Sequence, residues 1–121
     1  MANLTDIKNQ FNSQELFEAF KIQLKKDFEQ SNLSTDFVET LAPDYYHIHD
    51  KIVIELHRIE KKTDFNVMNL VNRIDISEAQ LKRYLEANKS EPRFSVIAEL
   101  IIKRVLQKVV IKKLYKNNER S

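Results

Sequence analysis

Residues 64–94 read DFNVMNLVNRIDISEAQLKRYLEANKSEPRF and contain two helix starts of the same design, eleven residues apart. Asn66 is placed to cap the first helix, and Ser77 is placed to cap the second, where Gln80 completes a capping box. Only the connection 74–76, called the elbow below, separates the two helices, so the chain must turn sharply there. Asp75, at its centre, tolerates a left-handed backbone better than most residues do. The stretch therefore predicts two short helices joined by a tight turn.

The apolar residues of this stretch are spaced so that they face inward when the two helices cross. They are Leu70, Val71, Ile74, Ile76, Leu81 and Tyr84. The residues left outside at the start of the second helix are Ser77, Glu78, Ala79, Lys82 and Arg83. An exposed helical start with small and long cationic side chains suits the major groove of DNA. We therefore expect residues 78–87 to form a recognition helix, in which Lys82 and Arg83 read base edges with help from Ser77 and Glu78.

The same stretch resembles the helix-turn-helix of the lambda-repressor-like (Cro and Xre type) superfamily. The residues that carry the resemblance are Phe65-Asn66, Leu70-Val71, Asp75-Ile76-Ser77, Leu81-Lys82-Arg83, Glu86, Asn88 and Pro92. It covers residues 60–106 and implies a DNA-binding regulator whose groove-facing positions are those named above. Val71 stands where the family prefers a smaller residue, and Asp75 stands where it has a turn glycine. The string ISEAQLKRYLEA is also similar to the first helix-turn-helix of AraC-type regulators, whose second motif the chain lacks.

The spacing of apolar residues predicts further helices before this stretch. A short turn of helix around Ile7 precedes a long amphipathic helix over residues 13–31, for which Asn12 is the expected cap. Its phenylalanines are candidates for the core or for an intermolecular interface. A short helix then ends before Pro43, because the residue preceding a proline is pushed out of the α region. Another long helix runs from residue 44 to about residue 61.

A long terminal helix is expected to begin at Ser95. Its cations recur every four positions and so form one stripe, the basic stripe, which consists of Arg104, Lys108, Lys112 and Lys116. The stripe is either a solvated face or a row of contacts to DNA phosphates, which add affinity that depends on salt but not on sequence. The phosphate contacts that we expect are Arg73, Lys89, Arg93, Arg104 and Lys108.

Composition narrows the fold class. The 121-residue chain has no Gly, the residue that tight hairpin turns use most. We therefore expect an all-α fold, a compact helical domain of five to six helices with a central helix-turn-helix and a long basic C-terminal helix. The chain also has no Cys, which excludes disulfides and thiol catalysis and fits a reducing cytoplasm. No apolar run approaches the roughly 20 residues that span a bilayer, and no signal peptide is evident, so we expect a cytoplasmic protein without membrane contact.

The net charge of +2 conceals a division of charge along the chain. Residues 1–50 hold four lysines against nine acidic residues and carry −5, whereas residues 51–121 hold sixteen cations against nine acidic residues and carry +7. Such asymmetry indicates an anionic partner for the basic half. We expect an acidic helical N-terminal extension over residues 1–43, a candidate for dimerisation. Residues 44–121 are expected to form a helix-turn-helix domain that binds double-stranded DNA as a homodimer.

Two other kinds of site find less support in the sequence. The cluster YYHIHD holds His47, His49 and Asp50, and His57 follows, but His47 and His49 diverge by about 200° around a helix. We expect neither a metal nor another cofactor. Ser and His residues form no nucleophile motif, so we expect no enzymatic activity. The alternative to DNA binding is a helical-bundle protein-interaction module of the immunity or adaptor type, in which residues 66–88 are ordinary bundle helices.

Overall fold

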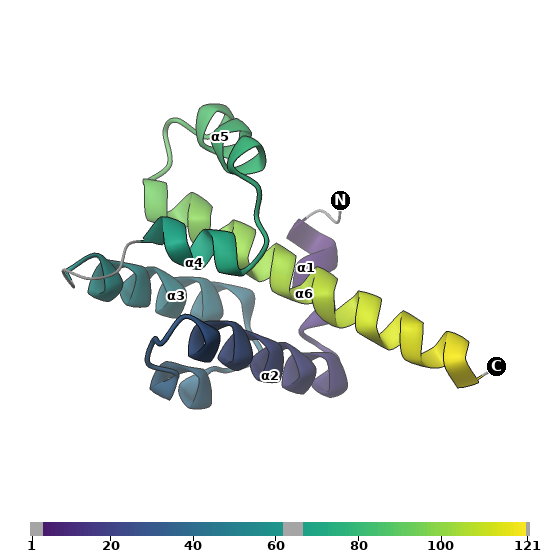
Figure 1. The fold of residues 1–121 in the computed structure, drawn as a ribbon. Coiled ribbons are helices and arrows are strands. Elements are labelled where there is room, and N and C mark those ends of the chain that lie inside the picture. Colours follow the sequence, from purple (N-terminus) through teal and green to yellow (C-terminus); the bar gives the residue numbers. More distant parts are fainter. Residues whose placement is uncertain (1–3, 62–66, 121) are drawn as a thin grey trace.

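The computed structural model describes residues 4–61 and 67–120, with side chains for residues 6–61 and 67–114 (Figure 1). This part of the chain is all-helical, which confirms the expected fold class. Its elements are α1 (Leu4–Gln10), α2 (Gln14–Gln30), the 3₁₀ helix η1 (Asp36–Thr40), α3 (Tyr45–Glu60), α4 (Val67–Arg73), α5 (Glu78–Ala87) and α6 (Arg93–Arg120). None of these helices is both long and apolar enough to cross a bilayer.

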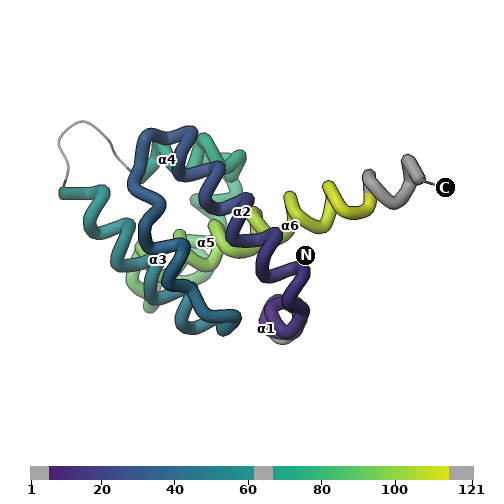
Figure 2. Tube along the Cα trace, turned by 90° about the horizontal axis from the view of Figure 1, so that it is seen from below, coloured from purple at the N-terminus to yellow at the C-terminus, as the bar shows by residue number. Residues whose placement is uncertain are grey.

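The longest helix, α6, is the element on which the others are assembled. It contacts α2, α3 and α5, while α4 contacts α2 and α3. In Figure 1, α5 lies at the top of the molecule, on the side of α6 away from α2. Figures 1 and 2 both show the C-terminal part of α6 extending beyond the other helices. The fold therefore presents α5 and the end of α6 at its periphery.

One hydrophobic cluster extends through the described helices. It includes Ile7 and Phe11 near the N-terminus, and it continues through α3 and α4 to Leu106 on α6. The aromatic rings of α2 are buried in it, and Phe11 makes edge-to-face contacts with Phe17 and Phe20. The boundary predicted at residue 43 falls between η1 and α3, and side chains on both sides of it belong to this cluster.

Helix boundaries differ from expectation at two places. The cap of α2 is Ser13, whose Oγ accepts from the Leu16 N–H at 3.3 Å, so the prediction of Asn12 was wrong by one residue. Both residues are good caps by type, so residue type alone does not choose between them. Helix α6 begins at Arg93 instead of Ser95, directly after Pro92. The predicted cap of α4, Asn66, lies outside the described residues.

Candidate nucleic-acid interface

The elbow between α4 and α5 is built as a Schellman motif. Asp75 has a φ of 69°, in the left-handed region, as the sequence predicts. Its N–H donates to the Asn72 carbonyl oxygen at 3.1 Å, and the Ile76 N–H donates to the Val71 carbonyl oxygen at 3.1 Å. These are the two bonds of the motif, and they satisfy carbonyl groups that a helix end otherwise leaves without partners. The chain thus turns between α4 and α5 within four residues, 74–77, and the two bonds keep these carbonyl groups paired.

Burial of apolar side chains holds the elbow against the body. Of the six positions expected to face inward, five are buried: Leu70, Val71, Ile74, Ile76 and Leu81. The sixth, Tyr84, packs against the core while remaining partly exposed. Apolar contacts on both sides of Asp75 therefore fix where α5 begins.

The start of α5 is capped as predicted. The Ser77 Oγ accepts from the Gln80 N–H at 3.0 Å, and the Ser77 backbone is extended. At the other end, the Asn88 side-chain amide donates to the Tyr84 carbonyl oxygen at 2.8 Å. Bonds at both ends define α5 as a separate short helix, and its main contact with the body is to α6.

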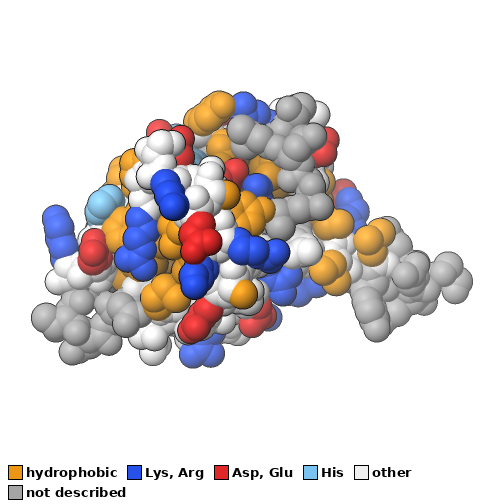
Figure 3. All heavy atoms as spheres, turned by 90° about the horizontal axis from the view of Figure 1, so that it is seen from above, with side chains coloured by type: hydrophobic (Ala, Val, Ile, Leu, Met, Phe, Trp, Pro, Cys, Tyr) orange, Lys and Arg blue, Asp and Glu red, His pale blue; other side chains and the backbone are white. Residues whose placement is uncertain are grey.

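The outer face of α5 is exposed to solvent. The five predicted groove-facing residues, Ser77, Glu78, Ala79, Lys82 and Arg83, are all exposed. Arg73 at the end of α4, Lys89 after α5 and Arg93 at the start of α6 are exposed as well. Seen from above, with α5 towards the viewer, this side carries several groups of Lys and Arg side chains with acidic side chains between them (Figure 3). The structure thus leaves eight of the ten predicted contact residues accessible.

Part of the basic stripe of α6 packs against α2, and Lys108, an expected phosphate contact, lies in that part. Its Nζ lies 3.1 Å from Oδ2 of Asp27 on α2, and their side chains are 15% and 3% exposed. Asp27 also accepts from the Gln23 amide at 3.1 Å, and Lys112 donates to the same amide's oxygen. A buried carboxylate requires a cation and hydrogen bonds, and Lys108 supplies the cation. Lys116 lies among residues whose side chains are not described.

Arg104 is also turned away from the expected interface. It is half-buried beside a cleft between α1, α5 and α6, and one terminal N–H donates to Oε1 of Gln107 at 2.8 Å. Its Nε is enclosed and has no hydrogen-bond acceptor. For Arg104 as for Lys108, helical spacing shows which cations share a face, but not which helix lies against that face.

The histidines of the YYHIHD cluster make separate contacts between helices. His49 Nε2 lies 3.0 Å from the Ser95 carbonyl oxygen and 3.1 Å from its Oγ, and Nδ1 lies 3.3 Å from Asp50 Oδ1. Both atoms of Ser95 contact the same ring nitrogen, Nε2, and the carbonyl oxygen can only accept a hydrogen bond from it. This contact, which sequence reasoning missed, joins α3 to the first turn of α6.

The described residues contain no group of three or more His, Cys, Asp or Glu side chains placed to hold a metal ion. His57 instead packs edge-to-face against Phe94, with ring centroids 4.7 Å apart. Tyr45, at the start of α3, is buried. Burial of its phenol, with smaller contributions from Glu99 and Tyr46, raises the pKa of Tyr45 well above its ordinary value.

Comparisons of the chain with protein-family models, with curated proteins and with solved structures find no match.

Proposed function

We propose that this protein is a cytoplasmic transcriptional regulator that binds double-stranded DNA with α4 and α5 as a helix-turn-helix. The observation that carries the proposal is the elbow at Asp75, which turns the N-terminal half of α5 outward with Lys82 and Arg83 exposed. A seven-residue helix, a four-residue connection and a ten-residue helix suit the insertion of the second helix into a major groove.

The exposed cations divide into two groups by position. Lys82 and Arg83 lie on the outer face of α5 and read base edges, where an arginine bonds a guanine in bidentate fashion. Ser77 and Glu78 precede them on the same helical start and contact neighbouring bases. Arg73, Lys89 and Arg93 flank α5 and hold phosphates, which fixes the register of the helix on the duplex. Arg104 and Lys108 have no part in this arrangement, because the first lines a cleft and the second is paired with Asp27.

The test is a titration of labelled random-sequence duplex, followed by fluorescence anisotropy, and a selection of preferred sequences from the same pool. Three phosphate contacts per protomer predict a salt slope of about −3 for each protomer that binds. Arg83→Ala should reduce affinity for the selected sequence by about tenfold while changing affinity for the random pool little. Lys26→Ala on α2, an equally exposed cation far from α5, is the matched control. Absence of binding at about 50 mM salt and micromolar protein excludes the proposal.

We also propose that the protein acts as a homodimer through a groove between α2 and α6. The groove, of about 280 Å³, is lined by apolar residues that include Leu16 and Val109. Ile22, which also lines the groove, is 70% exposed. The rim of the groove carries one carboxylate, Glu15 of α2, which pairs with Lys113 of α6, so two copies related by a two-fold axis can exchange this exposed pair between them. In sedimentation equilibrium, Ile22→Asp should yield monomers, whereas Ile54→Asp on α3 should not.

The same groove favours one alternative function. An apolar channel between two helices can accept an amphipathic helix of another protein, as in a protein-interaction module of the immunity or adaptor type. That alternative predicts no affinity for duplex DNA in the titration above. It also predicts that Arg83→Ala changes nothing measurable, so the same experiment separates the two functions.

A further inference from the structure

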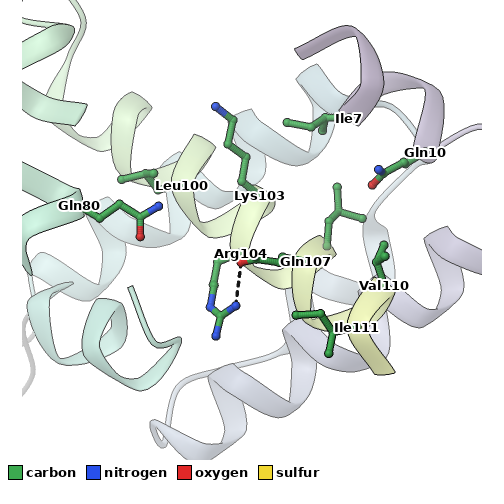
Figure 4. Close-up of a pocket in the computed structure, with 10 residues that line it drawn as sticks. Ile7, Gln10, Gln80, Leu100, Lys103, Arg104, Gln107, Val110 and Ile111 are labelled. Atoms are coloured by element: carbon green, nitrogen blue, oxygen red, sulfur yellow. Dashed lines mark hydrogen bonds between the residues drawn. The ribbon is translucent and has the colours of Figure 1, made fainter. Parts of the chain in front are cut away.

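A second concave site lies between α1, the first turn of α5 and the middle of α6. It is a cleft of about 250 Å³, and Figure 4 shows side chains of all three helices around it. Ile7 and Gln10 come from α1, Gln80 comes from α5, and the remaining lining residues come from α6. None of the contacts proposed for DNA lies in this cleft.

The walls of the cleft are mainly apolar. Ile7, Leu100 and Leu106 are buried side chains that form part of them, and Ile111 lies at the rim, 49% exposed. Ligand sites are typically apolar clefts with a few polar groups that fix the orientation of the ligand. Here the polar groups are side-chain amides and two cations, which indicates a ligand with an apolar body and a polar end.

Lys103 and Arg104, the two cations of the cleft, differ in whether an acidic side chain already pairs with them. Lys103 Nζ lies 3.3 Å from a carboxylate oxygen of Glu99 and 5.1 Å from the ring centroid of Tyr84. Arg104 has no ion pair among the described residues. One of its N–H groups bonds Gln107, and its enclosed Nε lacks an acceptor (Figure 4). A guanidinium carries five N–H donors, so the protein leaves most of them for water or for a ligand.

We propose that this cleft binds a small amphipathic monocarboxylate. The carboxylate accepts hydrogen bonds from the Arg104 guanidinium, the group that matches it in bidentate geometry, and the hydrocarbon body lies against Leu100, Ile7 and Ile111. One uncompensated cation suits a single negative charge better than the two charges of a phosphate monoester. The side-chain amide of Gln80 closes the cleft on the α5 side.

The volume limits the size of the ligand. An apolar cavity of roughly 150 Å³ holds benzene, so a cleft of about 250 Å³ accepts a molecule somewhat larger. A carboxylate with an unbranched chain of medium length meets this limit, and octanoate is the probe we choose. Octan-1-ol has the same chain length without the charge and is the matched neutral probe.

The experiment is isothermal titration of the full chain with octanoate and with octan-1-ol, combined with two-dimensional amide NMR. Octanoate should bind with a dissociation constant between micromolar and millimolar, and octan-1-ol should bind at least tenfold more weakly. The amide signals of Ile7, Gln80 and Gln107 should shift on titration. Arg104→Gln should weaken octanoate at least tenfold but leave octan-1-ol unchanged, because it removes the charge and keeps the apolar wall.

Two further variants make the result specific. Ile111→Trp places a large ring at the exposed rim of the cleft and should abolish the binding of both probes without a change in the core. Arg83→Gln on the outer face of α5 should leave octanoate binding unchanged even if it abolishes sequence preference on DNA, so the ligand site and the proposed function can fail separately. Equal binding of octanoate to the unaltered chain and to both cleft variants, or no binding at all, overturns the proposal. Circular dichroism establishes that each variant is folded.

Discussion

Lys108 on α6 and Asp27 on α2 are 81 residues apart in the sequence, and their charged atoms lie 3.1 Å apart. The pair closes a polar network with Gln23 and Lys112 that runs along the contact between the two helices. In the sequence the basic stripe suggests an open basic surface. At Lys108 and Lys112, however, it packs against α2. The pair therefore contributes to stability and to the relative position of α2 and α6.

The first prediction compares two ion pairs between the same helices. Lys108→Ala leaves the buried Asp27 carboxylate without a cation and should lower the free energy of unfolding by about 3 kcal/mol. Lys113→Ala should cost less than about 1 kcal/mol. Its partner Glu15 also lies at 3.1 Å, but the two side chains are 45% and 75% exposed. Urea denaturation followed by circular dichroism measures both values. Equal losses in the two variants would contradict the role assigned to burial.

The second prediction concerns the left-handed residue of the elbow. Asp75→Gly should stabilise the fold by about 0.5–1 kcal/mol, because glycine adopts a positive φ without a Cβ clash, whereas Asp75→Ala should destabilise it by about 1 kcal/mol. Asn32 has a φ of 58° at the end of α2, and its Gly and Ala variants are the control. The same ordering is expected at both positions. Thermal unfolding is the measurement, and an Asp75→Ala variant as stable as the parent would show that the elbow is not strained.

The third prediction separates phosphate contacts from packing contacts. Lys89→Ala should weaken binding to every duplex sequence and make the salt slope shallower by about one unit. Lys112→Ala removes an equal charge from α6 but should leave the slope unchanged, because Lys112 donates to Gln23 on α2. Anisotropy titrations over a range of salt concentrations give both slopes. A smaller slope for Lys112→Ala alone would move the interface from α5 to α6.

The fourth prediction is a pH dependence. Because burial raises the pKa of Tyr45 in the folded state, its phenol ionises first in the unfolded chain, near the ordinary pKa of about 10. Above that pH the unfolded state binds fewer protons than the folded state, so stability falls as pH rises. Tyr45→Phe should remove this part of the alkaline loss. Tyr46→Phe, a change at an exposed neighbour, should not. Urea unfolding between pH 8 and pH 11 provides the comparison.

Local sequence signals were sufficient for the elbow and for α5. A capping serine, a residue that tolerates positive φ and an alternation of apolar positions all act within a few residues of one another. They predicted the bond from Gln80 to Ser77, the left-handed Asp75 and the exposure of Lys82 and Arg83. Such features depend on the neighbouring backbone and on burial of the adjacent helix face, so a single sequence contains most of the information needed to predict them.

Contacts between helices that are far apart in the sequence could not be predicted from such local signals. Asp27 follows Lys25 and Lys26 in the sequence and suggests a solvated ion pair, yet it is buried opposite Lys108. Nothing in the sequence distinguishes His49 and Ser95 from other residues of a helix surface. Their contact forms only because α3 packs against α6. Which face of one amphipathic helix lies against which neighbour is decided by the packing of the whole chain, and neither periodicity nor charge spacing determines it.

The position of Lys108 also bears on how the chain folds as it is synthesised. Translation adds residues at a rate of about 5–20 per second, so several seconds pass between the appearance of Asp27 and that of its cation. During this interval α2 can form as a helix, but the surface that later receives α6 is exposed to water, and the Asp27 carboxylate on it has no counter-charge. We expect the nascent acidic half to remain open and accessible to chaperones until α6 leaves the ribosome, after which closure completes the core in one step.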